Sequence, residues 1–519
     1  MSILFLCATV VLARQGGAKV DCLTFHYNNA RLGWDDREQI LTPAALTQGG
    51  FGKLWTQPLD GAVRHSPLVV SNCKIEGQIR DVVFAGTDEN SLFAVDAKSG
   101  QVLWSKKQIF RPLNGTQFSG SSFDDRQLGI LGTPVIDRET QTIYACCPRS
   151  KGLSQQYIVV ALDLSSGEMK PGFPHVLRGQ DKGATFNAGA ELQRGALSLV
   201  NGWLLVPFGG RGDNPPWRGW LLGLNTRNLN ETSAFCASPK TDGGGLWSGG
   251  GVSSTADGTV FAATGNGTFD LNTGGLNASE SVLQLKMAQK SLLSASYTPK
   301  NYAFLDEQDE DLGGATPNLL PPQPGTIPNL MFTGGKDGCA YLLNRDHLGG
   351  IGGELQRQRY FCPEKATYHE GIRSTSCYLD AGANGKMVIV AGDEEGPSGS
   401  KGVAALSLEV DPKLGYVQFK QRWTIARQLI YPSSPIVTSY QGSGGVVWVV
   451  ETGQNPGSND QPASLHAYNA LTGEELIDTA KIKGANFMSG KRFTAPTAAN
   501  GMVFVPSTGL IAFGFKAQP

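Results

Sequence analysis

Hydrophobic and polar residues alternate most regularly between Asp88 and Trp104, in the stretch DENSLFAVDAKSGQVLW. Leu92 and Ala94 lie on one face of a strand, a polar tight turn follows, and a second alternating run ends at Trp104. Gly100 occupies the turn position that needs a positive φ, which glycine adopts without a steric penalty. The stretch therefore predicts a β-hairpin.

The same hairpin recurs along the chain in less regular form. Its clearer copies are IVVALDLSSGE at Ile158–Glu168, LHAYNALTGE at Leu465–Glu474 and LLGLN at Leu221–Asn225, and weaker copies are CAYLLNRD at Cys339–Asp346 and VAALSL at Val403–Leu408. A chain of 519 residues would ordinarily divide into roughly two to four domains. The recurrence instead indicates one repeat architecture.

A second periodic mark is a proline near the start of one strand in each unit. The intervals along Pro67, Pro134, Pro317, Pro435 and Pro496 are 67, 183, 118 and 61 residues, close to one, three, two and one times about 61. Related segments without proline fill the gaps, namely RGALSLV near Gly195, SGGGVSST at Ser248 and STSCYLD near Ser374. The marks define eight units.

Eight units of roughly four strands predict an all-β fold, an eight-bladed β-propeller of four-stranded antiparallel blades that spans residues 51–519 as a single domain. The segment Phe51–Leu59 (FGKLWTQPL) is a strand without a preceding blade, and the last unit, Pro496–Phe515, lacks a closing Trp-bearing strand. Pairing the N-terminal strand with the C-terminal unit would close the ring and leave no free sheet edge.

Composition and charge narrow the function classes. The 67 glycines, 28 prolines and 17% charged residues are typical of a turn-rich β protein. A net charge of −1 provides no field for binding nucleic acid or an anionic membrane surface. No apolar run is long enough to span a bilayer.

The N-terminal residues 1–13 (MSILFLCATVVLA) resemble the apolar region of a secretory signal peptide, with a cleavage site at Val11–Ala13. They lack the usual leading Lys or Arg, and the alternative is a buried first strand. We expect a secreted or extracellular protein, periplasmic if the source is bacterial. Residues 14–50 form a polar lead-in with few strand signals.

Cysteines and sequons fit the same expectation. Removal of Cys7 with the signal leaves eight of the nine cysteines, an even number that suits disulfides in an oxidising compartment. Glycosylation sequons, meaningful only in a eukaryotic secretory pathway, begin at Asn114, Asn230, Asn266 and Asn277. Four sequons could also arise by chance in a chain rich in Asn, Ser and Thr.

The hairpin pattern, apolar-x-Ala-x-Asp-x-x-[Ser/Thr]-Gly-x-x-x-Trp, resembles the repeat of the quinoprotein alcohol dehydrogenases, which hold pyrroloquinoline quinone (PQQ) on an eight-bladed propeller. The resemblance covers roughly Phe51 to Phe515. Segments such as FGKLWTQPLDG, ATGNGTFD and GGKDGCAYLLNRD look most like a secreted group of PQQ-binding-like propellers. Non-catalytic relatives, including the lipoprotein scaffold of the bacterial outer-membrane assembly machine, share the repeat.

The resemblance implies four site residues. Trp247, in GGGLWSGGGVSS, matches the indole on which the quinone stacks. Asn266, in TGNGTFD, matches a calcium ligand, and Asp311, in LDEQDEDLGG, matches the catalytic base. Lys336 matches the cation beside the quinone. The alternatives are an indole wedged between blades, a turn Asn, a solvated acidic loop and a Lys on a tight turn.

Further matches depart from the family pattern. Asp213 is the acidic residue nearest to the family's calcium Glu, and its spacing is imperfect. Cys146 and Cys147 invite comparison with the vicinal disulfide that covers the quinone, and Arg149 with the Arg that follows it. The pair here ends a strand (TIYACC) instead of preceding a turn, so separate pairing or free thiols stay open.

Two functions follow from the resemblance. The first is a secreted oxidoreductase that oxidises a small-molecule alcohol with calcium-bound PQQ and passes electrons to an external acceptor. The second is a non-catalytic propeller that binds or scaffolds a protein partner. The sequence has no Cys-x-x-Cys-His, HExxH or GxSxG motif. His65 and His369 are placed near the channel, where a lone His is more often structural.

Overall fold

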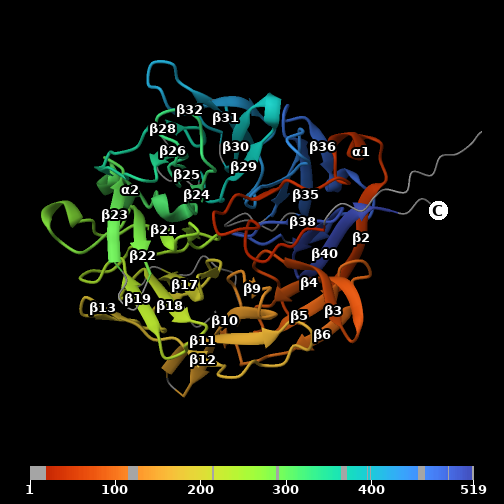
Figure 1. The fold of residues 1–519 in the computed structure, drawn as a ribbon, viewed down its shortest axis with the longest axis horizontal. Helices are drawn as coiled ribbons and strands as arrows, with labels where there is room; N and C mark the ends of the chain where they lie inside the picture. The colour runs from red at the N-terminus through yellow and green to blue at the C-terminus, as the bar shows by residue number, and fades with distance from the viewer. Residues whose placement is uncertain are drawn as a thin grey trace, which may run out of the picture.

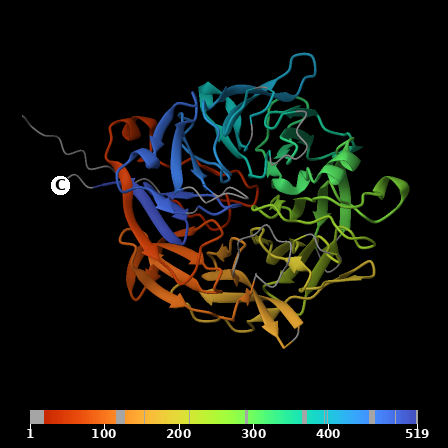
Figure 2. The same ribbon diagram turned by 180° about the vertical axis from the view of Figure 1, so that it is seen from behind.

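The computed structural model describes residues 19–114, 127–152, 154–212, 215–287, 292–363, 371–393, 395–397, 399–453, 462–488 and 490–516. Eight β-sheets surround a central axis like the blades of a propeller (Figure 1). Each blade is built on four antiparallel strands, so the predicted all-β, eight-bladed fold is confirmed. The view from behind shows the same ring (Figure 2).

The first four blades run in sequence order around the axis. Their strands are β3 (Leu68–Ile75), β4 (Gln78–Gly86), β5 (Leu92–Asp96) and β6 (Val102–Lys106) in blade 1; β9 (Val135–Asp137), β10 (Thr142–Lys151), β11 (Ser154–Asp163) and β12 (His175–Val176) in blade 2; β16 (Ser198–Val200), β17 (Trp203–Gly210), β18 (Trp220–Asn225) and β19 (Thr232–Cys236) in blade 3; and β20 (Ser253–Ser254), β21 (Thr259–Ala263), β22 (Val282–Lys286) and β23 (Leu292–Thr298) in blade 4.

The other four blades complete the ring. Their strands are β24 (Asn318–Leu319), β25 (Leu330–Gly334), β26 (Cys339–Asn344) and β28 (Gln356–Arg359) in blade 5; β29 (Cys377–Asp380), β30 (Lys386–Ala391), β31 (Val403–Val410) and β32 (Val417–Thr424) in blade 6; β33 (Ile436–Thr438), β34 (Val446–Glu451), β35 (Pro462–Asn469) and β36 (Glu475–Asp478) in blade 7; and β38 (Thr497–Ala499), β39 (Met502–Pro506), β40 (Gly509–Phe515) and β2 (Phe51–Pro58) in blade 8.

Short elements decorate this ring. They are β1 (Trp34–Asp35), β7 (Leu113–Asn114), β8 (Gln127–Leu128), β13 (Gln180–Asp181), β14 (Ala184–Thr185), β15 (Glu191–Leu192), β27 (Gly350–Ile351), β37 (Phe487–Met488), the helices α1 (Pro43–Thr47) and α2 (Tyr302–Gln308), and the 3-10 turns η2 (Leu271–Thr273), η3 (Leu312–Gly314), η4 (Gly382–Asn384) and η5 (Thr479–Lys481). Within the described ranges, no helix has the length and apolar character needed to cross a membrane.

The ring closes as the sequence predicts. The N-terminal strand β2 pairs antiparallel with β40, from Phe51 opposite Phe515 to Pro58 opposite Gly509. The Phe51 ring packs 5.4 Å from the indole of Trp448 in blade 7. Closure gives blade 8 its fourth strand and joins the two ends of the repeat array.

Tryptophans and turn glycines join neighbouring blades. The indole of Trp104 in blade 1 donates to Leu164 O at 2.9 Å and lies against Gly167, where an added Cβ would come within 2.7 Å of the ring. Trp55 packs in the same way on Gly100 in the next blade. The turn glycines are therefore needed both for positive φ and for contact with the indole of the preceding blade.

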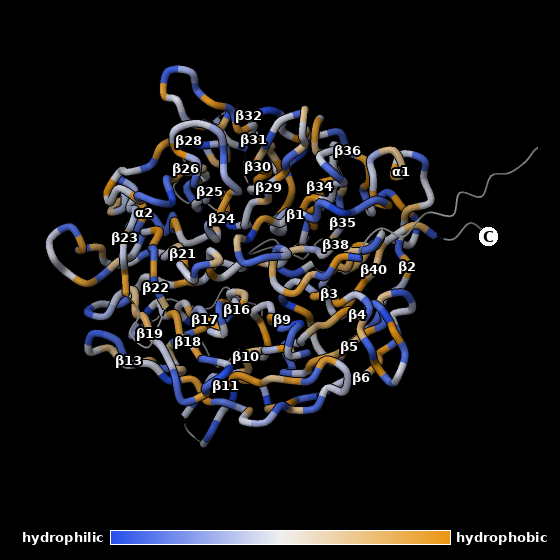
Figure 3. Tube along the Cα trace, viewed as in Figure 1, coloured by the Kyte–Doolittle hydropathy of each residue, from blue (hydrophilic) through white to orange (hydrophobic). Residues whose placement is uncertain are grey.

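Apolar residues follow the blade strands, whereas polar residues concentrate in the outer turns (Figure 3). Eight buried hydrophobic clusters fill the eight interfaces between successive blades, including the one between blades 8 and 1. The core is consequently a ring of eight similar interfaces.

The polar lead-in lines the centre of the propeller. Its residues 20–35 contact the inner strand of every blade, by the hydrogen bonds Cys22–Val69, Leu23–Ile136, Asn29–Leu199, Asn29–Ser254, Ala30–Leu319, Leu32–Tyr378, Gly33–Val437 and Tyr27–Ala498. The red segment at the centre of Figure 1 is this part of the chain. It satisfies backbone groups of the inner strands that an empty channel would leave to water.

The prediction of disulfides is wrong for the described cysteines. All eight of them are buried, and no disulfide joins any two of them, including Cys146 and Cys147 in β10. Successive strand residues point to opposite faces of a sheet. Accordingly, Cys147 packs in the interface between blades 1 and 2, and Cys146 packs in the interface between blades 2 and 3. Their side chains point apart, so no vicinal bridge forms.

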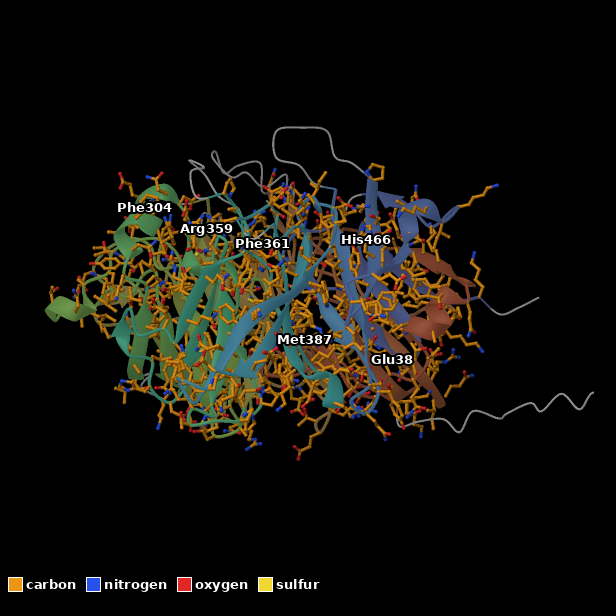
Figure 4. All side chains as sticks on the ribbon, turned by 90° about the horizontal axis from the view of Figure 1, so that it is seen from above. Glu38, Phe304, Arg359, Phe361, Met387 and His466 are labelled. Carbon is orange, nitrogen blue, oxygen red and sulfur yellow. The ribbon has the colours of Figure 1, made fainter. Side chains whose placement is uncertain are left out.

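The two faces of the propeller differ. Seen from the side, Phe304, Arg359 and Phe361 lie toward one face and Glu38 lies toward the other (Figure 4). We call the first one the upper face. Two connections of each blade lie on this face: the one that leads into the inner strand, and the one that joins the second strand to the third.

Candidate active site at the upper end of the channel

Trp247 lies on the propeller axis. It precedes β20 of blade 4, and its indole meets the Phe493 ring edge to face, with centroids 5.8 Å apart. Phe493 precedes β38 of blade 8, which stands opposite blade 4 in the ring. Residues of opposite blades can touch only near the axis, so Trp247 marks the upper end of the channel.

Trp247, Asp311 and Lys336 form one connected group. The indole N–H of Trp247 donates to Asp311 Oδ2 at 2.6 Å, and Lys336 Nζ donates to Asp311 Oδ1 at 3.1 Å. Lys336 Nζ also lies 5.4 Å from the centroid of the Trp247 ring. The three residues belong to separate connections, before β20, before β24 and between β25 and β26. The structure thus brings together three residues that the sequence predicted for one site.

Glycine makes this close approach possible. A Cβ at Gly265 would lie 2.3 Å from Asp311 Oδ2 and 2.7 Å from Trp247 Nε1. A Cβ at Gly209 would lie 2.9 Å from the Trp247 Cβ. The hydrogen bond between the indole and the carboxylate therefore depends on both glycines.

Asp309 and Asn266 extend the group. Asp309 ends α2 with a left-handed backbone (φ 56°), and its Oδ1 accepts from Lys336 Nζ at 2.8 Å. Asn266, between β21 and β22, contributes an amide N–H to Asp309 Oδ1 at 3.4 Å. Asn266 is thus placed beside the carboxylates, and its amide N–H faces Asp309.

The carboxyl groups in this cluster differ in protonation. Burial alone would raise the pKa of Asp311, but the Lys336 ammonium and hydrogen bonds from its neighbours outweigh burial and hold that pKa below its usual value. Burial and the adjacent charge of Asp311 raise the pKa of Asp309 to about 7. At neutral pH, Asp311 is a carboxylate and Asp309 is close to its titration midpoint.

Glu280 is a further member that sequence reasoning missed. It is fully buried, and its Oε2 accepts from the backbone N–H of Leu312 at 2.8 Å. Its Oε1 is buried and has no hydrogen-bond partner in the described part of the chain. Burial and the charge of Asp311 raise the pKa of Glu280 well above its usual value. The sequence gives no local signal for this role, because Glu280 lies in an irregular connection.

Arg194 was also missed. Its guanidinium lies 4.8 Å from the centroid of the Trp247 ring and 4.1 Å from that of Phe493, and its Nε donates to Trp247 O at 2.8 Å. A signal for it exists in the sequence. Arg64, Arg194 and Arg373 each stand four residues before an inner strand begins. The same position before an inner strand therefore carries an arginine in blades 1, 3 and 6.

The other predicted site residues do not join this group in the structure. Cys146 and Cys147 are buried in blade interfaces, as described above. Arg149 donates to Gln156 Oε1 at 3.0 Å and lies over the ring of Phe110 at 4.8 Å, so its contacts are with blades 1 and 2. Asp213 lies outside the described residues.

The two histidines considered for the channel give no support for a ligand role. His65 is buried, and its Nε2 accepts from Gly86 N at 2.8 Å while its Nδ1 lies 2.9 Å from Ser66 O. Burial lowers the pKa of His65 to about 4, so the ring is neutral and structural. His369 lies outside the described residues.

The donor set at the channel end fits calcium and a planar anion. Calcium takes carboxylate and amide oxygens, which Asn266, Asp309 and Asp311 supply, and Glu280 adds a buried carboxyl oxygen without a partner among the described residues. The Arg194 guanidinium lies over Trp247, so a planar quinone could stack on this indole only by displacing it. The residues that are present therefore suit calcium, and they suit a planar quinone where Arg194 moves off the ring.

Comparisons with known proteins agree with the fold. A family model described as outer membrane protein assembly factor BamB matches residues 52–170. No curated protein matches the chain. The quinohemoprotein alcohol dehydrogenase ADHIIG from Pseudomonas putida HK5 is similar in structure, with a TM-score of 0.61 and 12% identity over 96% of this chain and 81% of that chain.

Two further structures are similar. The quinohemoprotein alcohol dehydrogenase from Comamonas testosteroni gives a TM-score of 0.58 at 15% identity and covers 96% of this chain and 81% of its own. A europium-containing methanol dehydrogenase gives a TM-score of 0.58 at 14% identity and covers 94% of this chain and 90% of its own. At such identities the likeness establishes the fold. The resemblance to PQQ-binding-like eight-bladed propellers is confirmed.

Proposed function

We propose that the upper end of the channel binds PQQ and calcium and oxidises a small alcohol. The observation that carries the proposal is the hydrogen-bonded group of Trp247, Asp311 and Lys336, assembled from three separate connections at the channel end. The structural neighbours named as alcohol and methanol dehydrogenases support the reaction class. Trp247 would stack the quinone, while Asn266 would hold calcium beside Asp311.

Asp311 is suited to accept the proton of the alcohol. A bound quinone would supply the two-electron acceptor. The Lys336 ammonium keeps Asp311 ionised at neutral pH, and the indole N–H of Trp247 fixes the orientation of its carboxylate. Asp309 shares Lys336 with Asp311, has a pKa of about 7 and is 45% exposed in its side chain. It can therefore pass the proton to solvent.

The same proposal includes where the protein acts. An external acceptor takes the electrons, because the chain has no Cys-x-x-Cys-His motif for covalent haem. Secretion, expected from residues 1–13, would place the protein where such an acceptor and a small alcohol meet it. Glycosylation at the sequons would belong to a eukaryotic secretory pathway.

The test is reconstitution of the full chain with calcium and PQQ, followed by dye-linked alcohol oxidation. We expect activity in the wild type and a loss of about 100-fold or more in Asp311→Asn, without loss of quinone binding. Glu307→Gln is the matched control, since it removes an exposed carboxylate from the same acidic run. A wild type that takes up no quinone, or an Asp311→Asn variant as active as the wild type, would refute the proposal.

A non-catalytic propeller is the second candidate, and one observation favours it. Lys336 already bridges Asp309 and Asp311, and Arg194 already covers the Trp247 ring. The group is thus satisfied by cations of the chain itself. A protein partner on the upper face would then replace the quinone and the alcohol. Absence of PQQ binding in the reconstitution experiment would favour this candidate.

A further inference from the structure

Blade 7 contains a second cluster of ionisable groups, away from the channel. His466 lies on β35 and is fully buried, and Glu475 and Asp478 lie on the neighbouring outer strand β36. Figure 4 labels His466 within the blade. The side chain of Glu475 is 30% exposed, so the cluster borders solvent on one side.

The spacing around His466 Nδ1 is unsuited to hydrogen bonding. Nδ1 lies 3.6 Å from Glu475 Oε1 and 3.8 Å from Asp478 Oδ1, both longer than a hydrogen bond. Nδ1 is buried and has no hydrogen-bond partner among the described residues. A buried imidazole nitrogen with two carboxylate oxygens just beyond bonding distance needs another partner.

The same spacing suits a small divalent metal. Zinc binds imidazole nitrogen and carboxylate oxygen at roughly 2.0–2.2 Å in a tetrahedron, which places two ligand atoms about 3.3–3.5 Å apart. The separations of 3.6 and 3.8 Å exceed that by a few tenths of an ångström. All three atoms lie within 4.8 Å of one another, so the two carboxylates must rotate toward each other to complete the site.

The other ring nitrogen is already supported. His466 Nε2 lies 2.8 Å from Ser464 Oγ and 3.4 Å from Glu451 Oε2. A metal-bound histidine typically donates its remaining ring N–H to such an oxygen, which fixes the ring and the tautomer. With Nε2 protonated toward Ser464 or Glu451, the lone pair of Nδ1 points at Glu475 and Asp478.

The surrounding charges leave room for a cation. Arg427 pairs with Glu451 and lies 3.3 Å from Asp478 Oδ2, while Lys481 pairs with Glu475 through Oε2. These contacts use the outer carboxylate oxygens, so Glu475 Oε1 and Asp478 Oδ1 still face His466, and Asp478 Oδ1 also accepts from Ala480 N at 2.9 Å. Burial lowers the pKa of His466, but the neighbouring carboxylates of Glu451 and Glu475 outweigh it and raise that pKa, so a metal ion at Nδ1 would take the place of a proton.

We propose that His466 Nδ1, Glu475 Oε1 and Asp478 Oδ1 bind a zinc ion, or a similar divalent transition metal, that ties β35 to β36 in blade 7. The imidazole ligand favours zinc over calcium. The fourth position faces solvent beside Glu475 and takes water. Lys481, whose side chain is 67% exposed, moves away from the bound metal. This site is independent of the channel and of the proposed oxidation.

The experiment strips the full chain with EDTA and dialyses it against zinc, with metal counted by mass spectrometry. We expect one zinc ion per chain in the wild type. Glu475→Gln should weaken binding more than about tenfold, because loss of a ligand costs at least as much as loss of a supporting contact. Glu474→Gln, which removes the adjacent exposed carboxylate, should bind zinc like the wild type.

Cobalt reports the ligand type in the same variants. Cobalt in place of zinc should give the strong visible bands of a four-coordinate site in the wild type and Glu474→Gln, and lose them in Glu475→Gln and His466→Asn. Thiolate charge-transfer bands would assign the metal to cysteines and overturn the proposal. Equal zinc affinity in the wild type and Glu475→Gln, or no retained zinc, would also overturn it.

Discussion

At the scale of single residues, the channel end concentrates unusual backbone conformations. Asp309, Glu280 and Phe493 all have positive φ, at 56°, 49° and 60°. Each costs on the order of 1 kcal/mol or more in a residue with a side chain, so the surrounding contacts must enforce it. The conformations direct a carboxylate, a buried carboxyl and an aromatic ring toward the group around Trp247. Such residues gather at binding sites more often than elsewhere.

A buried carboxyl group in blade 3 gives a pH prediction. Glu191 is 2% exposed, and burial raises its pKa to about 9 although Arg218 N donates to its carboxyl oxygens. Between the usual pKa of 4.5 and the folded value, the folded protein holds a proton that the unfolded chain has released. Unfolding then releases that proton, so the free energy of unfolding falls as pH rises through this window.

The prediction is tested by urea unfolding between pH 5 and pH 9, with Glu191→Gln as the variant. The wild type should lose stability as pH rises, and the variant should lose less because the neutral amide keeps an acceptor for Arg218 N. Glu139→Gln is the control, since that side chain is exposed, and its free energy of unfolding should fall with pH as steeply as in the wild type. The prediction would be contradicted if the free energy of unfolding fell equally steeply with pH in the wild type and in Glu191→Gln.

Local motifs predicted some site residues and could not predict others. Trp247, Asp311 and Lys336 lie in segments whose spacing matches a known pattern, so the sequence was enough to place them together. Glu280 reaches the site through an irregular connection that no local spacing encodes, whereas Arg194 has a positional signal that was missed, four residues before an inner strand. The disulfide prediction was wrong because counting cysteines ignores strand direction, which points Cys146 and Cys147 to opposite faces.

At the scale of elements, the lead-in determines what the channel can hold. Arg31 is fully buried, and its guanidinium donates to Val252 O, Phe25 O, Leu197 O and the hydroxyls of Thr24 and Ser198. Burial lowers its pKa to about 9, so it stays charged at neutral pH. A polar segment without strand pattern therefore serves as a core element, which its composition did not predict.

Substitution of Arg31 tests this role. Arg31→Leu removes the guanidinium donors to the carbonyls of Val252, Phe25 and Leu197, and should lower the free energy of unfolding by about 3–5 kcal/mol. Arg37→Leu is the matched control, because its side chain is 51% exposed, and should change stability by about 0.5 kcal/mol or less. Denaturant unfolding measures both. An Arg31→Leu variant as stable as the wild type would contradict a structural role for the lead-in.

At the scale of the whole molecule, the repeat was predictable because it depends on local periodicity. Proline spacing gave the eight blades, and the unpaired strand at Phe51–Pro58 gave the closure with β40. Local periodicity could not predict the difference between the two ends of the channel. The lead-in contacts all eight inner strands, while the upper end collects Trp247, Asp311 and Lys336. A ligand consequently approaches Asp311 from the upper face.

The central claim is that this upper end binds PQQ, and equilibrium dialysis of the quinone against the full chain with calcium tests it most directly. The account predicts saturable binding of one PQQ per chain, lost in Trp247→Leu and retained in Trp34→Leu, which removes an indole outside the group around Asp311. Wild-type protein that shows no saturable binding, or that binds no better than Trp247→Leu, would contradict it.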